Sequence, residues 1–278
     1  MQFNPYHHNN EVLQQRINQI LQTDQAHTVP PETIRLLFSC MDLTSLDGTD
    51  NVQRISELCT RALNYRDADP GIAVAAVCLY MPFISLAKSM LEGTGIAVAT
   101  VACGFPSGQI PLGLKLDEVR FAVAEGADEI DMVISRGSML AGDEDTVYRE
   151  ISMVKEKCGR AHLKVILETG ELIHPSVIRR ASELALLAGA DFLKTSTGKI
   201  NPAATPLAAL VMLDTIAEYY AATGRKVGFK PAGGIVSLQD AFSYFQLVHA
   251  VAGTEWLNPS LFRIGASRLA ENLRLASA

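Results

Sequence analysis

The chain has 278 residues, a formal net charge of −6 and a hydrophobic fraction of 48%. The acidic balance provides no basic surface for a nucleic-acid partner, and no uninterrupted run of about 18 apolar residues is present to cross a membrane. The five cysteines are scattered through mostly apolar runs, as is typical of reduced core thiols, and the N-terminus lacks a secretory signal. We therefore expect a cytoplasmic protein that acts on small molecules.

Residues 1–35 are predicted to form a short helical N-terminal extension. Its apolar residues fall on one face of a helix, at Leu13, Ile17, Ile20 and Leu21. The Pro30-Pro31 pair separates this segment from the rest of the chain. Residues 36–278 are predicted to form one catalytic domain, because one (β/α)8 barrel of about 250 residues fits this length, although two small domains would fit it too.

Eight short apolar runs rich in β-branched residues follow in order and are predicted to be strands. They lie at 37–43, 72–80, 96–103, 127–135, 162–169, 191–197, 227–233 and 262–267. Segments of helical period separate most of them, and the longest has Thr205 as N-cap, Pro206 at its first position and Gly224 as its stop. Nearly continuous apolar strands that alternate with helices indicate a parallel sheet covered on both faces. Eight such units predict an α/β fold, the (β/α)8 TIM barrel.

Polar side chains stand where most of these strands end, and the active sites of such barrels lie at that end. The residues concerned are Asp42, Cys78, Asp131, Glu168, Lys194, Lys230 and Ser267. Side chains alternate between the two faces of a strand. If the faces that carry Asp131, Lys194 and Lys230 look inward, all three residues point into one pocket.

Two lysines in one apolar pocket predict a reactive amine. An ordinary lysine has a pKa of about 10.4, and both desolvation and a positive neighbour lower it. The resulting neutral amine attacks a carbonyl to give a Schiff base, which promotes making or breaking of the adjacent C–C bond. Asp131 and Lys230 are candidates for moving protons. The alternative is that these two form a buried ion pair of purely structural value.

No metal or cofactor is expected. The six histidines form no HxH, HExxH or His/Cys cluster with the spacing of metal ligands. The segment TSTGK, residues 195–199, is not a Walker phosphate loop, because no glycine stands five residues before Gly198.

Six segments, taken in order, resemble the deoxyribose-phosphate aldolase family. They are MDLT (41–44), GADEIDMVI (126–134), LKVILETGEL (163–172), GADFLKTSTGK (189–199), VGFKPAGGI (227–235) and RIGAS (263–267). The resemblance implies a metal-free class I aldolase on a TIM barrel, which cleaves 2-deoxy-D-ribose 5-phosphate reversibly into acetaldehyde and D-glyceraldehyde 3-phosphate. It also implies that Lys194 is the Schiff-base lysine, Lys230 the lysine that perturbs it, and Asp131 the proton-relay acid.

Two further residues match family positions. Asp42 is similar to an aspartate near the second lysine. Cys78 is similar to a cysteine that lines the substrate pocket, and a buried core thiol is the alternative for it.

The phosphate of the substrate is predicted to bind main-chain N–H groups at the barrel rim. Gly233-Gly234 follow the seventh strand and Ser267 follows the eighth, which is where barrels commonly bind phosphate. Gly198 and Lys199 are candidates to close this site.

The sequence departs from the family pattern at two places. Arg268 stands where a second serine is common, and its guanidinium is expected either to contact the phosphate or to lie in solvent. The chain ends in LASA, without the tyrosine found near the tail of some members. We expect a homo-oligomer, either a dimer or a tetramer.

Two other functions are compatible with parts of this pattern. A barrel that binds a phosphorylated metabolite for regulation would share the phosphate site, but a second buried lysine would add desolvation cost without benefit to such a protein. Another Schiff-base aldolase, such as a transaldolase, would share the lysine chemistry.

Overall fold

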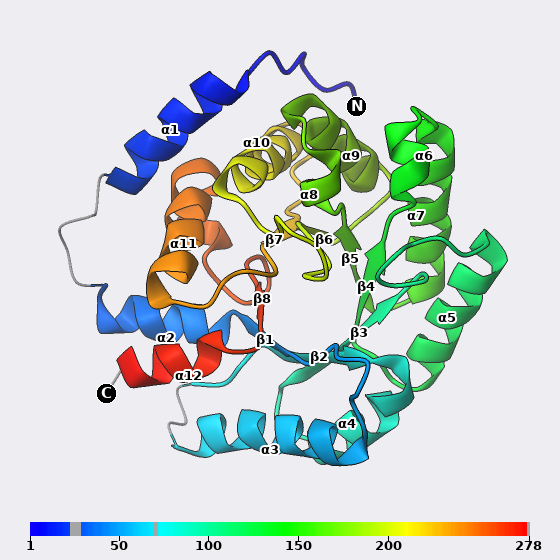
Figure 1. The fold of residues 1–278 in the computed structure, drawn as a ribbon, viewed down its shortest axis with the longest axis vertical. Helices are drawn as coiled ribbons and strands as arrows, with labels where there is room; N and C mark the ends of the chain where they lie inside the picture. The colour runs from blue at the N-terminus through cyan, green and yellow to red at the C-terminus, as the bar shows by residue number, and fades with distance from the viewer. Residues whose placement is uncertain (23–28, 69–71, 277–278) are drawn as a thin grey trace.

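The computed structural model describes residues 1–22, 29–68 and 72–276, and within them the chain forms a barrel of eight parallel strands surrounded by helices (Figure 1). The strands are β1 (Met41–Thr44), β2 (Ala76–Tyr80), β3 (Ala97–Ala102), β4 (Glu129–Val133), β5 (His162–Ile166), β6 (Phe192–Lys194), β7 (Gly228–Lys230) and β8 (Ile264–Ala266). Their order in the sheet is β7-β6-β5-β4-β3-β2-β1-β8. Parallel bridges from Phe229 to Phe262 and from Ala232 to Gly265 bring the two ends of the sheet together. The predicted TIM barrel is confirmed.

Helices cover the outer face of this barrel, as Figure 1 shows. The α-helices are α1 (Asn10–Gln22), α2 (Pro31–Ser39), α3 (Val52–Ala68), α4 (Ile84–Met90), α5 (Leu112–Ala124), α6 (Arg136–Leu140), α7 (Glu144–Cys158), α8 (Thr169–Leu172), α9 (Pro175–Leu187), α10 (Pro206–Thr223), α11 (Leu238–Ala252) and α12 (Leu269–Ala276). Two 3₁₀ turns, η1 (Met81–Phe83) and η2 (Thr254–Trp256), follow β2 and α11. The main apolar core lies between strands and helices, where alternate strand residues such as Leu163, Leu193 and Phe229 are fully buried.

The first predicted strand is wrong over residues 37–39, which belong to helix α2. Pro31 occupies the first helical position, where its missing N–H costs nothing. The buried residues Ile34, Leu37 and Phe38 have helical spacing, and a short apolar run of this kind fits a strand and a helix equally well. The strand itself begins at Met41.

The predicted ends of the long helix α10 are confirmed. The hydroxyl of Thr205 accepts a hydrogen bond from the Ala208 N–H, and Pro206 is the first helical residue. Gly224 ends the helix with a φ of 71°, a conformation that glycine adopts without strain.

The helical N-terminal segment packs on the outside of the barrel. The apolar face of α1 buries Leu13 and Ile17, and α1 lies beside α10 and α11 (Figure 1). The Arg16 guanidinium pairs with both carboxylate oxygens of Asp214 on α10, at 2.7 and 2.9 Å. The Tyr6 hydroxyl donates to the same carboxylate at 2.8 Å. Residues 23–28 of the predicted extension lie outside the described residues.

We expect Asp214→Ala to lower stability without altering the interior of the barrel. The change removes the carboxylate that accepts hydrogen bonds from both Arg16 and Tyr6. The Asp214 side chain that carries it is only 14% exposed. Charge-assisted hydrogen bonds of this kind contribute about 1–3 kcal/mol, and each kcal/mol corresponds to roughly 2–4 °C in Tm for a chain of this size. Thermal unfolding measures the loss.

Arg16→Ala, alone and combined with Asp214→Ala, is the control for that prediction. The two losses should be less than additive because the residues share one interaction. Fully additive losses would contradict the pairing.

Candidate active site

The interior of the barrel holds a group of buried charged side chains, one or two from most strands. They are Asp42 on β1, Glu129 and Asp131 on β4, Lys164 on β5, Lys194 on β6, Lys230 on β7 and Arg263 just before β8. Each is at most 6% exposed. Burial of a charge costs free energy unless a partner of opposite sign compensates it, so these residues must be considered together.

Asp131 lies at the centre of the group and contacts three lysines. Its Oδ2 accepts hydrogen bonds from Lys194 Nζ at 2.8 Å and from Lys230 Nζ at 2.7 Å. Its Oδ1 accepts one from Lys164 Nζ at 3.0 Å. The structure therefore brings together Asp131, Lys194 and Lys230, as the alternation of side chains predicted.

Two other carboxylates complete the network. Asp42 forms ion pairs with Lys230 and, at 2.7 Å, with Arg263 Nη1. Glu129 forms an ion pair with Lys164 and accepts a hydrogen bond from Arg263 Nη2 at 2.7 Å. Asp42 is thus near the second lysine.

The ring of Phe192 packs beside the cationic groups of this network. Lys164 Nζ lies 5.9 Å and the Arg263 guanidinium 5.8 Å from its centre, within the range of cation–π attraction. On β7 the facing position is Gly228, where a Cβ atom would clash with the Phe192 ring. The missing side chain leaves the space that the ring fills.

The network contains four basic and three acidic side chains, so one basic group must share its carboxylate with another. Lys230 contacts both Asp131 and Asp42. Burial lowers the pKa of Lys230, but the attraction of these two carboxylates is stronger in total and raises it. Lys194 pairs, among the described residues, with Asp131 alone. Burial lowers the pKa of Lys194; Asp131 opposes this shift and the Lys230 ammonium reinforces it. The lysine with the lowered pKa is therefore Lys194.

The acids of the network are held in their charged form. Although burial disfavours the carboxylate, the ammonium groups of Lys164, Lys194 and Lys230 keep the pKa of Asp131 well below its usual value. Lys230 and Arg263 do the same for Asp42.

A cavity of about 380 Å³ opens above Lys194 at the carboxyl ends of the strands. Its lining includes the residues predicted for the phosphate end: Gly198, Lys199, Gly233, Gly234, Ser267 and Arg268. Ser267 and Arg268 are exposed, and the Lys199 ammonium donates to the carbonyl oxygen of Leu46. The structure thus places the predicted phosphate residues and Lys194 in one cavity.

Cys78 does not lie on the wall of that cavity. It is fully buried in a small apolar cluster inside the barrel, with Ala76, Ala99 and Val101. Burial raises the pKa of its thiol.

Three members of the network received no role in the sequence interpretation: Glu129, Lys164 and Arg263. Glu129 lies two residues before Asp131 on β4 and shares its face, and Lys164, like Lys194, is a lysine within an apolar strand run, so the signals that selected Asp131 and Lys194 apply to these two residues as well. Arg263 precedes β8, and only the closure of the barrel places it against Asp42 and Glu129.

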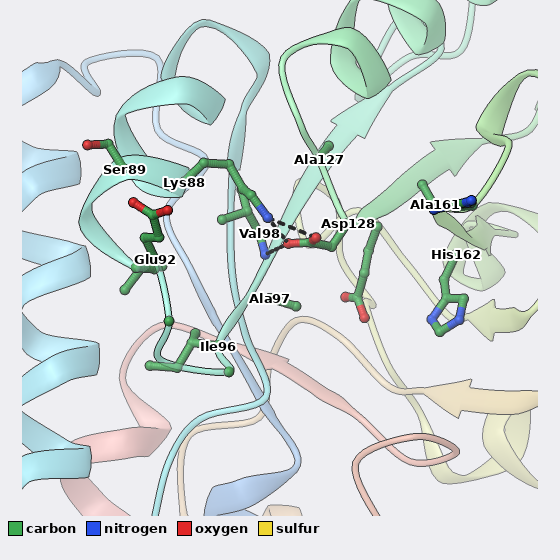
Figure 2. A pocket seen from close by; sticks show the side chains of 15 residues that line it. Lys88, Ser89, Glu92, Ile96, Ala97, Val98, Ala127, Asp128, Ala161 and His162 are labelled. Carbon is green, nitrogen blue, oxygen red and sulfur yellow. Dashed lines mark hydrogen bonds and ion pairs between the residues drawn. The ribbon is translucent and has the colours of Figure 1, made fainter.

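A larger cavity, of about 930 Å³, lies at the opposite end of the barrel, next to the amino-terminal ends of β3, β4 and β5. Figure 2 shows its lining residues from close by. Lys88 and Asp128 face each other there and form an ion pair at 2.9 Å. The predicted catalytic and phosphate-binding residues do not line it. Because barrel chemistry takes place at the carboxyl ends of the strands, the smaller cavity above Lys194 is the candidate active site.

Within the described ranges, no group of three or more His, Cys, Asp or Glu residues has the arrangement of a metal site. The helices in those same ranges are all too short or too polar to cross a membrane.

Comparison with known proteins identifies the family of the chain. The model of the DeoC/LacD family aldolases matches residues 36–253. The chain belongs to this aldolase family. The human deoxyribose-phosphate aldolase is 46% identical over 84% of the chain and 77% of its own length, and the bovine one is 46% identical over 83% and 76%. The prediction of an aldolase of the deoxyribose-phosphate aldolase type is confirmed.

Solved structures of the aldolase family share the same fold. A tetrameric deoxyribose phosphate aldolase from Aeropyrum pernix has a TM-score of 0.71 and 26% identity, and the match covers 92% of this chain and 95% of that one. Triosephosphate isomerase from Bartonella henselae, 16% identical with a TM-score of 0.55 over 86% of this chain and 97% of its own, shares the barrel fold.

We expect Lys230→Leu to raise the pKa of Lys194, because the change removes a positive neighbour and leaves the Oδ2 atom of Asp131 to Lys194. Acetaldehyde should form an imine with the neutral amine of Lys194, and borohydride should reduce this imine to a stable ethyl label. The extent of labelling as a function of pH therefore measures the change in the pKa of Lys194. The midpoint of labelling should move to higher pH.

The exposed lysine Lys226 offers a matched control. Lys226→Leu should leave the labelling profile of Lys194 unchanged. An identical profile in Lys230→Leu would show that Lys230 has no influence on Lys194.

Proposed function

We propose that this protein is a class I aldolase that cleaves 2-deoxy-D-ribose 5-phosphate reversibly to acetaldehyde and D-glyceraldehyde 3-phosphate through a Schiff base on Lys194. The observation that carries the proposal is the position of Lys194. It is the buried lysine with a lowered pKa, and it lines the cavity at the carboxyl end of the barrel of an aldolase-family chain.

The chemistry begins with the neutral amine of Lys194. Its nitrogen attacks the substrate aldehyde at C1, and loss of water gives a protonated imine. A base removes the proton of the C3 hydroxyl, the C2–C3 bond breaks, and its electrons move into an enamine as glyceraldehyde 3-phosphate leaves. Protonation of the enamine at C2 and addition of water then release acetaldehyde and regenerate the amine.

Asp131 and Lys230 are the proposed proton carriers for these steps. The Asp131 carboxylate bridges the two amines, with Lys194 and Lys230 both within 2.8 Å of the same oxygen. A proton released at one amine therefore has a hydrogen-bonded route to the other. The positive charge of Lys230 also favours the neutral form of Lys194 before the attack. Asp42 holds Lys230 in place through its ion pair.

The phosphate of the substrate is proposed to bind at the rim. Among the described residues, the main-chain N–H groups of Gly198, Gly234 and Ser267 have no hydrogen-bond partner, and all three residues line the cavity. Such N–H groups are suited to bind an anion. Lys199, Gly233 and Arg268 surround the same space. Cys78 contributes through packing inside the barrel, in the apolar cluster with Ala76, Ala99 and Val101.

We also propose that residues 1–35 form an extension to a single catalytic domain at 36–278, and that the chain acts as a cytoplasmic homo-oligomer. The family match beginning at residue 36 supports the division. The tetramer described for the Aeropyrum pernix enzyme supports the oligomer. The five free cysteines, all buried, are compatible with a reducing compartment.

The trapping experiment tests the Schiff base directly. Acetaldehyde followed by borohydride should add one ethyl group to Lys194, because only the neutral amine forms the imine that borohydride reduces. Intact-mass analysis and a peptide map locate the label. A label on Lys230, or no label on a folded protein, would contradict the mechanism.

Lys194→Met should abolish that label together with sugar cleavage while the fold persists, because methionine keeps much of the side-chain volume. Lys226→Met, at an exposed lysine, is the control and should behave as the wild type. Aldol cleavage that survives in Lys194→Met would rule out the Schiff base at this residue.

Arg268 offers a test of the phosphate end. A guanidinium–phosphate contact contributes about 1.5–3 kcal/mol, so Arg268→Ser should raise KM for the phosphorylated sugar by roughly 10- to 100-fold. Cleavage of unphosphorylated deoxyribose should change little. An unchanged KM would show that Arg268 lies in solvent and that main-chain N–H groups bind the phosphate without it.

A further inference from the structure

A buried carboxyl group outside the network of Asp131 lies beside the loop that follows β6, the strand that ends at Lys194. Glu168 comes two residues after β5 and is 0% exposed. Its backbone has a left-handed φ of 58°, which non-glycine residues rarely adopt. A strained and fully buried acidic residue of this kind needs interactions that hold it there.

The carboxylate of Glu168 binds Thr197 at two points. The main-chain N–H of Thr197 donates to Oε1 at 3.2 Å and to Oε2 at 3.4 Å. The Thr197 hydroxyl donates to Oε2 as well. The same hydroxyl oxygen accepts the main-chain N–H of Lys199 at 3.1 Å. Glu168 thus determines the conformation of residues 197–199, all of which line the cavity.

The charge of Glu168 is compensated from the other side by one partly buried arginine. Arg136 lies 3.4 Å from Oε2 of Glu168 and 3.0 Å from Oε2 of Glu171, and its Nη2 donates to the carbonyl of Ser107 at 2.9 Å. Burial, which is the largest effect, raises the pKa of Glu168 despite these contacts. The group therefore occupies a position that is costly to maintain. Its hydrogen bonds are those from Thr197 and one long bond from Arg136 Nη1 at 3.4 Å.

Lys194 itself is held by different interactions. The Leu167 N–H donates to the carbonyl of Lys194 at 3.0 Å, and the Thr169 N–H donates to that of Thr195 at 2.9 Å. These main-chain bonds do not involve the Glu168 carboxyl group. A change confined to that carboxyl group should disturb the rim loop and leave the backbone at Lys194 in place.

We infer that Glu168 is a positioning residue for the phosphate end of the substrate, and that it acts by holding Thr197, Gly198 and Lys199 in the conformation that receives the anion. The inference rests on the proposed function. It separates the two halves of the site: the Asp131 network prepares the amine, and Glu168 shapes the rim that binds the phosphate.

The decisive variant is Glu168→Gln, which keeps the size of the side chain and replaces one carboxylate oxygen by an NH₂ group. That group cannot accept the hydrogen bonds that the N–H and hydroxyl of Thr197 now donate to the carboxylate. We expect KM for 2-deoxyribose 5-phosphate to rise by about 10- to 100-fold, with kcat changed by less than about threefold. KM for unphosphorylated deoxyribose and labelling of Lys194 by acetaldehyde and borohydride should stay as in the wild type.

Glu171→Gln is the matched control, because Glu171 shares Arg136 with Glu168 but has no contact with Thr197 among the described residues. It should leave all four quantities unchanged. Thr197→Val provides a second route if Glu168→Gln folds poorly. It should raise the same KM, and the double variant should be less than additive because the two residues form one contact.

The outcomes separate this inference from the proposed function. The positioning role would be overturned if Glu168→Gln left KM for the phosphorylated sugar unchanged. It would also be overturned if the variant lost activity equally on both sugars and lost the label on Lys194. In either case a wild type that is active and labelled would still support the aldolase mechanism. A wild type that neither cleaves the phosphorylated sugar nor accepts the label would overturn the proposed function itself.

Discussion

The pairing of buried charges inside the barrel is the interaction on which the rest of the site depends. Four basic and three acidic side chains, six of them on five strands and Arg263 just before β8, share a space that excludes water. Removing one member leaves an uncompensated charge in a medium of low dielectric, which costs several kcal/mol. Because Asp131 accepts from lysines on β5, β6 and β7, the network also ties together strands that are distant in sequence. The barrel and its chemistry are therefore held by the same contacts.

The network is not uniform along the barrel axis. Toward the amino-terminal ends of the strands Arg263 is bound by both Asp42 and Glu129, and its charge is satisfied. Toward the carboxyl ends, next to the candidate site, Lys194 shares the Oδ2 atom of Asp131 with Lys230. The lysine next to the cavity is thus the one whose ammonium form is least stabilised, and a lowered pKa is what a nucleophilic amine requires. Lys194 and Lys230 have the same side chain, and their pKa values differ because they lie differently relative to the carboxylates.

At the rim of the barrel, buried ion pairs have a second effect: they hold loops in place rather than shift the pKa of a lysine. Lys115, fully buried on α5, contacts Ser135 at 2.6 Å and Glu150 at 2.8 Å, and so fixes the turn after β4. Arg136, the first residue of α6, follows this turn and pairs with Glu168, which accepts a hydrogen bond from the Thr197 hydroxyl. Loops that carry binding groups are easily displaced, and rigid support from neighbouring elements gives them a defined geometry.

Much of this was predictable because the signals are local. Alternating apolar runs and helical segments identified the eight strands, and the period of two along a strand selected Asp131, Lys194 and Lys230. The assignment of residues 37–39 to a strand is wrong because so short an apolar run has no distinctive period. The roles of Lys164 and Arg263 were missed although both lie within the segments that indicated the family.

The sequence by itself determined the fold, the family resemblance and the end of the barrel at which the candidate site lies. The tertiary structure decided which carboxylates each lysine meets. That assignment depends on contacts between residues as far apart as Asp131 and Lys230, separated by 99 positions. A pKa depends on burial and on charges within a few ångströms, and neither quantity exists until the strands close into a barrel.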